Sequence, residues 1–186
     1  MVVLRAAVLE LLSLGAAAAA QARALQVLHE EPYANNSTIV WYAAPSDTSS
    51  AAPQPHSRVT RRVSTACGDN LVTCTSKALA RADTCSGLFG YLSDKKATVP
   101  PRDSVAVCWV DPNLEPAATS GGSNSQCCTA WREWNNGIFL GYLLGAATKT
   151  WDQCKTGNGM VGGVTNEVNL NGICQSQCLG NTRECF

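Results

Sequence analysis

The strongest hydrophobic pattern in the chain lies between residues 138 and 154, IFLGYLLGAATKTWDQC. Apolar side chains recur there at helical spacing, and polar residues such as Lys149 and Asp152 fall on the other side. The segment predicts an amphipathic helix, and the four-residue repeat of Gly141 and Gly145 predicts its close approach to a sheet. The apolar stripe consists of Leu140, Leu143, Leu144, Ala147, Trp151 and Cys154.

A second helical stripe runs through residues 74–94. Thr75 or Ser76 is placed to cap its amino end. Gly87 and Gly90 weaken the second half, which predicts a broken helix. The stripe consists of Leu79, Ala82, Cys85, Phe89 and Leu92.

Several segments have the alternation or the β-branched and aromatic composition of strands. The segment 126–131 is expected to pair with 103–110 and to place Trp131 in the core. After the last strand, at 164–170, the chain is expected to form a coiled carboxyl tail. A turn follows at Asn136 and Gly137. The predicted strands are residues 37–42, 59–67, 103–110, 126–131 and 164–170.

From residue 58 onward these elements follow the order strand, helix, strand, strand, helix, strand. This β-α-β-β-α-β order is the split βαβ arrangement, in which two helices pack on one face of an antiparallel sheet. The fold class predicted is therefore α+β, a small antiparallel sheet with two helices on one face, stapled by disulfides.

The chain divides into three parts by composition. Residues 1–22 combine Arg5, an apolar run and a small-residue cleavage site, as a signal peptide does; the alternative is a short amphipathic helix. Residues 23–57 contain one strand and a linker rich in Pro and Ser, and 58–186 form the cysteine-rich α+β domain. No other segment approaches the roughly 20 apolar residues of a membrane span.

The ten cysteines all lie between Cys67 and Cys185, and their even number favours complete pairing in an oxidising, extracellular compartment. Neighbours in a strand face opposite sides, so Cys127 and Cys128 are expected to bond different partners. The spacing does not favour a zinc site or a free nucleophilic thiol, and the connectivity stays open. The predicted disulfide cysteines are Cys67, Cys74, Cys85, Cys108, Cys127, Cys128, Cys154, Cys174, Cys178 and Cys185.

Two short motifs indicate processing on a secretory route. Asn35 and Asn36 begin overlapping N-glycosylation sequons. Arg61 and Arg62 form a dibasic pair that resembles a protease cleavage site, although the alternative, a strand through 59–67, is favoured because a paired strand is closed to proteases.

Charge and histidine placement exclude several functions. Lys plus Arg and Asp plus Glu both number 14, so the balanced charge gives no footprint for nucleic acid. His29 and His56 both precede residue 58, so the cysteine-rich domain holds no Ser-His-Asp triad. Paired carboxylates remain possible. The candidates are Asp69, Asp83, Asp94, Asp103, Asp111, Glu115, Glu133, Asp152, Glu167 and Glu184.

A resemblance rests on cysteine-bearing motifs: ACGDNLVTC, VCWV, QCCTAW, the TWDQC helix end and GICQSQCLGNTREC. With these motifs the chain resembles the WD-like domain of small secreted fungal proteins, and more distantly the fungal killer-toxin and necrosis-inducing effector folds. The first resemblance covers roughly residues 25–186. Neither family supplies a catalytic residue, and likeness of fold alone does not carry function.

These features favour a secreted fungal protein that acts by binding, as an effector or toxin-like protein without catalysis, metal or cofactor. We expect a monomer whose partner is an extracellular protein or a cell-wall polysaccharide. The alternative is a polysaccharide-binding or carboxylate-dependent glycoside-hydrolysing protein. Exposed aromatic side chains make strong contacts at interfaces. The candidates are Trp109, Trp134 and Trp151, and the alternative for each, which the sequence favours, is a place in the core.

Overall fold

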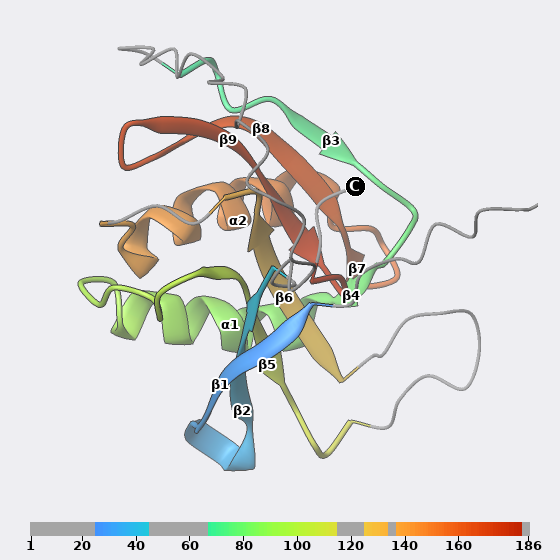
Figure 1. Cartoon of the computed structure of the whole chain (residues 1–186). Coiled ribbons are helices and arrows are strands. Elements are labelled where there is room, and N and C mark those ends of the chain that lie inside the picture. The colour runs from blue at the N-terminus through green and yellow to red at the C-terminus, as the bar shows by residue number, and fades with distance from the viewer. Residues whose placement is uncertain (1–24, 45–66, 115–124, 134–136, 184–186) are drawn as a thin grey trace, which may run out of the picture.

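The computed structural model describes residues 25–44, 67–114, 125–133 and 137–183, and its centre is a seven-stranded sheet (Figure 1). Every pair of neighbouring strands is antiparallel. A separate two-stranded sheet pairs β4 (Ala80–Arg81) with β7 (Met160–Val161). The order across the large sheet is β1 (Gln26–Pro32), β2 (Thr38–Ala43), β5 (Ser104–Val110), β6 (Gln126–Trp131), β9 (Ile173–Gly180), β8 (Gly163–Leu170) and β3 (Val72–Cys74).

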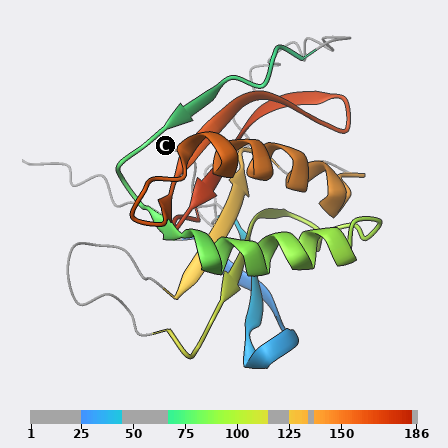
Figure 2. The same cartoon turned by 180° about the vertical axis from the view of Figure 1, so that it is seen from behind.

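Helices α1 (Ala82–Asp94) and α2 (Leu140–Cys154) lie side by side on one face of this sheet (Figure 2). The sheet residues that face them include Trp41, Val107 and Leu179, and these join the helix stripes in one core. The prediction of an α+β fold with two helices on one face of an antiparallel sheet is confirmed.

The strands predicted at 37–42, 103–110, 126–131 and 164–170 are confirmed as β2, β5, β6 and β8. The predicted coiled tail is wrong, because residues 173–180 form β9 between β6 and β8. Its inward side chains include Gln177, whose Nε2 donates to Thr129 Oγ1 (2.8 Å) and to the Leu143 carbonyl (2.6 Å). A strand that turns glutamines inward shows no hydrophobic alternation.

The amino-terminal hairpin belongs to the same sheet as the cysteine-rich region. Strand β2 pairs with β5, with Ile39 and Trp41 in the core under the helices and Val40 and Tyr42 in a smaller cluster on the other face. The predicted division at residue 57 is therefore not a division of the fold, because strands from both sides of it pair in one sheet. Between β1 and β2 lies the 3-10 turn Ala34–Asn36.

Helix α1 begins at Ala82, so the predicted start at residue 74 and the cap by Thr75 or Ser76 are wrong. The chain before it forms β3 and β4 instead, and the Ala82 N–H donates to the Gly159 carbonyl (2.8 Å) across the small sheet. The predicted break is also absent, since the helix continues through Gly87 to Asp94. Packing against the sheet outweighs the low helix propensity of glycine.

Helix α2 matches its prediction, but the roles of its two glycines differ from those expected. A Cβ on Gly141 would lie 3.1 Å from the Lys96 carbonyl oxygen, in the loop after α1, and not against a sheet. A Cβ on Gly145 would meet nothing within 4 Å. The close approach therefore joins α2 to a loop.

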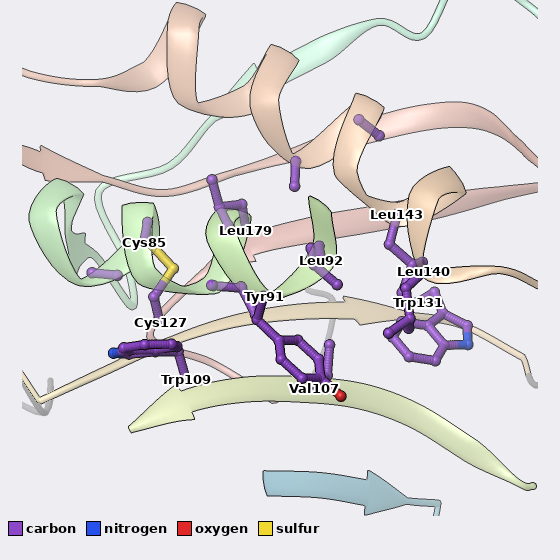
Figure 3. Close-up of a cluster of buried hydrophobic side chains, with 14 of the residues drawn as sticks. Cys85, Tyr91, Leu92, Val107, Trp109, Cys127, Trp131, Leu140, Leu143 and Leu179 are labelled. Atoms are coloured by element: carbon purple, nitrogen blue, oxygen red, sulfur yellow. A yellow bond between two sulfur atoms is a disulfide. The ribbon is translucent and has the colours of Figure 1, made fainter. Parts of the chain in front are cut away.

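The core between helices and sheet is built of aromatic and aliphatic side chains around one disulfide (Figure 3). The Cys85–Cys127 bridge joins α1 to β6, and both cysteines are fully buried. Trp131 is buried beside Leu140 and Leu143, which confirms its predicted core position.

Four disulfides cross-link the described residues, and none of the described cysteines is free. Cys127 and Cys128 bond different partners on opposite faces of β6, as predicted. Cys178 is disulfide-bonded as well, while Cys185 lies outside the described residues. The four bridges are Cys67–Cys174, Cys74–Cys154, Cys85–Cys127 and Cys108–Cys128.

Other predictions also fall outside the described residues. They concern the signal peptide at 1–22, the linker at 45–57, the strand before Cys67, the dibasic pair Arg61 and Arg62, and Trp134.

Two hydrogen bonds from phenol to carboxylate fasten the β1–β2 hairpin to α1. The Tyr33 hydroxyl donates to Asp94, and the Tyr91 hydroxyl donates to Glu31. The two rings meet edge to face with centroids 5.2 Å apart. Burial, followed by the hydrogen bond to Glu31, raises the pKa of Tyr91, and the hydrogen bond to Asp94 raises the pKa of Tyr33.

We expect these tyrosines to make the fold sensitive to alkali. A phenol whose pKa is raised on folding stabilises the folded state below its ordinary pKa, about 10, and this stabilisation is lost as the pH rises through the folded pKa. The Tm should therefore begin to fall as the pH rises through about 10 and keep falling toward the raised pKa of the folded state, and less steeply in Tyr91→Phe. Scanning calorimetry across this range measures it, and a Tm slope equal in both proteins would contradict the assignment to Tyr91.

Candidate functional site

Of the tryptophans expected to make binding contacts, Trp109 and Trp151 lie within the described residues, and neither is exposed. Trp109 is only 8 % exposed and belongs to the core. Trp151 is half-buried, with its ring edge to face with Phe89 (centroids 6.1 Å apart) and the Lys155 ammonium 4.5 Å from its centroid. Trp109 therefore takes the core position that was its alternative, because its ring packs against α1 where Gly87 leaves room.

Two other aromatic residues are exposed. Phe139, directly before α2, is 39 % exposed, and Tyr142 in its first turn is 45 % exposed. They are the only exposed aromatic residues in the part of the chain that the structure describes, and their ring centroids lie 6.0 Å apart. Sequence reasoning missed them because it followed the buried stripe of this helix. The available signal was an apolar residue lying off that stripe.

The loop after α1 is hydrogen-bonded to the start of α2. The N–H of Leu140 donates to the Thr98 carbonyl (3.1 Å), and the N–H of Gly141 donates to the Lys96 carbonyl (3.0 Å). The first N–H groups of a helix have no partner inside the helix, and α2 has no side-chain cap to satisfy them. The two loop carbonyls fill this role and fix the loop beside the two exposed rings.

A depression of about 410 Å³ opens between this loop and the rings. We call it the aromatic notch. The end of α1 and the start of α2 lie at the same end of the helix layer (Figure 2), and the residues that line the notch come from these two places. Its lining residues are Lys96, Ala97, Phe139, Gly141 and Tyr142.

The charge of the aromatic notch is a single cation. Among its lining residues only Lys96 is charged. The N–H of Tyr142 donates to the Phe139 carbonyl (2.9 Å), so the helix start offers no free donor to an anion. The notch suits a ligand with an apolar face and hydrogen-bond acceptors at its rim.

A second, polar depression of about 300 Å³ lies between the end of β6 and the β8–β9 hairpin. Glu133 and Glu167 both line it, and Glu167 has a φ of +60° in the β-bulge between Thr165 and Val168. Gln175 holds the backbone of Glu133, accepting from its N–H (3.0 Å) and donating to its carbonyl (3.3 Å). Two of the candidate carboxylates therefore share one groove.

A third depression, about 370 Å³ in volume, lies at the amino end of α1, and its charges are largely paired. Arg81 donates two hydrogen bonds to Asp83, at 2.9 and 2.5 Å. The bond from Arg81 lowers the pKa of the Asp83 carboxyl. This carboxylate already receives the Thr84 N–H, so it acts as a partner for the helix start.

The sequon residues Asn35 and Asn36 are exposed in the turn between β1 and β2, and both have positive φ. The Ser37 hydroxyl donates to the Ala34 carbonyl within the same turn. A glycan at either position would extend from the tip of the hairpin. Among the described residues no group of three or more His, Cys, Asp or Glu side chains is arranged to hold a metal ion.

No protein-family model, no curated protein and no solved structure matches this chain. The functional assignment therefore depends on the geometry of the chain alone. No helix within the described ranges is long and apolar enough to cross a membrane.

Proposed function

We propose that the chain is a secreted protein that binds an extracellular target without catalysis, and that the aromatic notch is its contact surface. The observation that carries the proposal is the placement of Phe139 and Tyr142 side by side and exposed, on a helix start that is fixed to the neighbouring loop. Rigid aromatic side chains bury a large area at low cost in conformational entropy.

Three further features support this proposal. The four disulfides fit an oxidising, extracellular compartment. The balanced charge gives no general attraction to an acidic or basic partner. The resemblance to the WD-like domain of secreted fungal proteins is part of the same proposal. The target is a host or competitor protein in an effector or toxin-like role, or a polysaccharide of a cell wall.

The proposal predicts that substitutions in the notch abolish target binding and leave the fold intact. Phe139→Ser with Tyr142→Ser removes both rings from exposed positions, so the Tm should change by less than about 3 °C. Sedimentation with insoluble chitin and β-glucan, leaf infiltration and growth inhibition of neighbouring fungi measure the activity. The control is Val27→Ser with Leu28→Ser, which removes exposed apolar side chains from β1 instead. Equal activity of the notch variant and the wild type would contradict the proposal.

The second candidate function is glycoside hydrolysis, favoured by the shared groove of Glu133 and Glu167. Paired carboxylates are the usual catalytic groups of such enzymes. A reducing-end assay on the same chitin and β-glucan detects it, because a hydrolase releases new reducing ends from these polymers. The enzymatic proposal would replace the binding proposal if the release of reducing ends disappeared in both Glu133→Gln and Glu167→Gln. The release should persist in the control, Asp152→Asn.

A further inference from the structure

We infer that the ligand of the aromatic notch is a single chain of a neutral polysaccharide, with sugar rings stacked on Phe139 and Tyr142. This inference rests on the proposed function and names its target. A pyranose ring presents a face of C–H groups to an aromatic ring and hydroxyl groups at its edge. The notch offers a partner to each part of the sugar. The rings of Phe139 and Tyr142 can contact the C–H face, and Lys96, which also lines the notch, can donate to the hydroxyl groups.

The angle between the two rings favours one chain over a crystalline surface. The ring planes of Phe139 and Tyr142 are inclined by 52°, and their centroids lie 6.0 Å apart. Rings that bind a flat crystalline face need to be coplanar, because every contact lies in one plane. Inclined rings instead form two facets on one side of the depression, which can contact adjacent units of one chain that lies between the rings and the loop at Lys96 and Ala97.

The two sides of the depression are held in place before any ligand binds. Carbonyl groups of Lys96 and Thr98 accept the first N–H groups of α2, and the absence of a side chain at Gly141 lets the loop approach this closely. Leu140 and Leu143 anchor the same turn in the core, where both are fully buried. Such preorganisation favours weak stacking ligands, because little conformational entropy is lost on binding.

The charge of the notch favours a neutral sugar. Lys96 can donate to hydroxyl or acetamide oxygens, and no carboxylate is among the lining residues. One lysine is a small attraction for a chain that carries a negative charge on every unit, and the helix start adds none because its N–H groups are occupied. A polyanion therefore has no arrangement of cations to bind here.

The size of the notch favours a sugar chain over a protein. A stable protein interface buries about 800 Å² on each partner and involves roughly 20 residues or more. Five residues line the notch, and of the other exposed large apolar residues in the described chain only Val99 lies in the adjoining loop. A short stretch of a sugar chain can be contacted by two aromatic rings and one lysine, whereas a protein partner would need a larger surface.

The test is a calorimetric titration of the full secreted chain with soluble hexasaccharides. The probes are the β-1,4-linked N-acetylglucosamine hexamer, the β-1,3-linked glucose hexamer and a hexamer of galacturonic acid. We expect one neutral hexamer to bind. Loss of one stacked ring, in Phe139→Ala or Tyr142→Ala, should weaken it roughly tenfold. Tyr142→Phe keeps the ring and should stay within about threefold of the wild type.

Two glycine substitutions in the same helix separate the positioning of the loop from a general effect on folding. Gly141→Ala places a Cβ 3.1 Å from the Lys96 carbonyl and should weaken binding roughly threefold to tenfold by moving the loop. Gly145→Ala, whose Cβ meets nothing within 4 Å, should leave the affinity unchanged. Equal affinities in these two variants would overturn the role assigned to the loop contact.

The outcomes distinguish this inference from the proposed function. If the notch variants lose activity on insoluble material or on cells, but no neutral hexamer binds or competes, the inference fails and the proposed function stands. Binding of the galacturonic acid hexamer alone would also overturn the neutral ligand. If Phe139→Ser with Tyr142→Ser changes neither the binding to insoluble material nor the effect on cells, the inference and the proposed function both fail.

Discussion

Replacing Cys85 and Cys127 together by alanine is expected to lower the free energy of unfolding by about 5 kcal/mol. The bridge spans 42 residues, but the intact Cys108–Cys128 bridge shortens the loop to about 24 residues, which are 23 from position 85 to 108 and one from 128 to 127. The chain-entropy contribution is then about 3.5 kcal/mol. The remainder comes from the cavity left by two fully buried sulfur atoms.

The matched control is Cys67→Ala with Cys174→Ala. This bridge spans 107 residues, but the intact Cys74–Cys154 bridge shortens its loop to about 27, which are 7 from position 67 to 74 and 20 from 154 to 174. The entropy contribution is again about 3.5 kcal/mol. Cys174 is exposed, so no buried cavity is added.

Urea unfolding without reductant measures both double variants. The Cys85 and Cys127 variant should be the less stable of the two by roughly 1.5 kcal/mol. Equal losses in the two variants would show that the core sulfurs contribute nothing beyond the cross-link.

The second large effect is expected at Gly87, on the face of α1 that meets the sheet. A Cβ there would lie 2.5 Å from the Trp109 ring, closer than packed carbon atoms can approach. The ring is held in the core and contacts Tyr33 edge to face, with centroids 5.4 Å apart. Gly87→Ala should therefore destabilise the protein by about 2 kcal/mol despite the better helix propensity of alanine.

Gly90, one turn later in α1, supplies a control for which alanine should raise the stability instead of lowering it. A Cβ at this position would meet nothing within 4 Å. Gly90→Ala should stabilise the protein by about 0.5 to 1 kcal/mol, because alanine loses less backbone entropy in a helix. Thermal unfolding of both variants measures the difference. A Gly87→Ala protein as stable as the wild type would mean that Trp109 has another low-energy position.

Local patterns were sufficient for the elements whose inward side chains are apolar. The stripe from Leu140 to Cys154 predicted α2, and the apolar run around Val107 predicted β5, because burial there repeats at the period of the element. The alternation of a strand also predicted that Cys127 and Cys128 have different partners. These properties depend on neighbours in the sequence.

Other features depended on residues far apart in the sequence. The start of α1 at Ala82 depends on the Gly159 carbonyl, and β9 depends on partners for Gln177 in β6 and α2. The sequence pattern contains neither of these contacts. It therefore predicted a helix that began too early and a tail without a strand.

For the candidate site, too, some properties followed from the local sequence and others from contacts between distant segments. The sequence indicated a cross-linked α+β domain in which exposed aromatic residues make the contacts, since cysteine number and hydrophobic period follow from composition and order. Which aromatic residues are exposed was decided by the packing of distant segments. Trp109 is buried because Gly87 of α1 admits its ring, whereas Phe139 and Tyr142 are exposed because the loop at Lys96 covers the helix start and leaves their rings free.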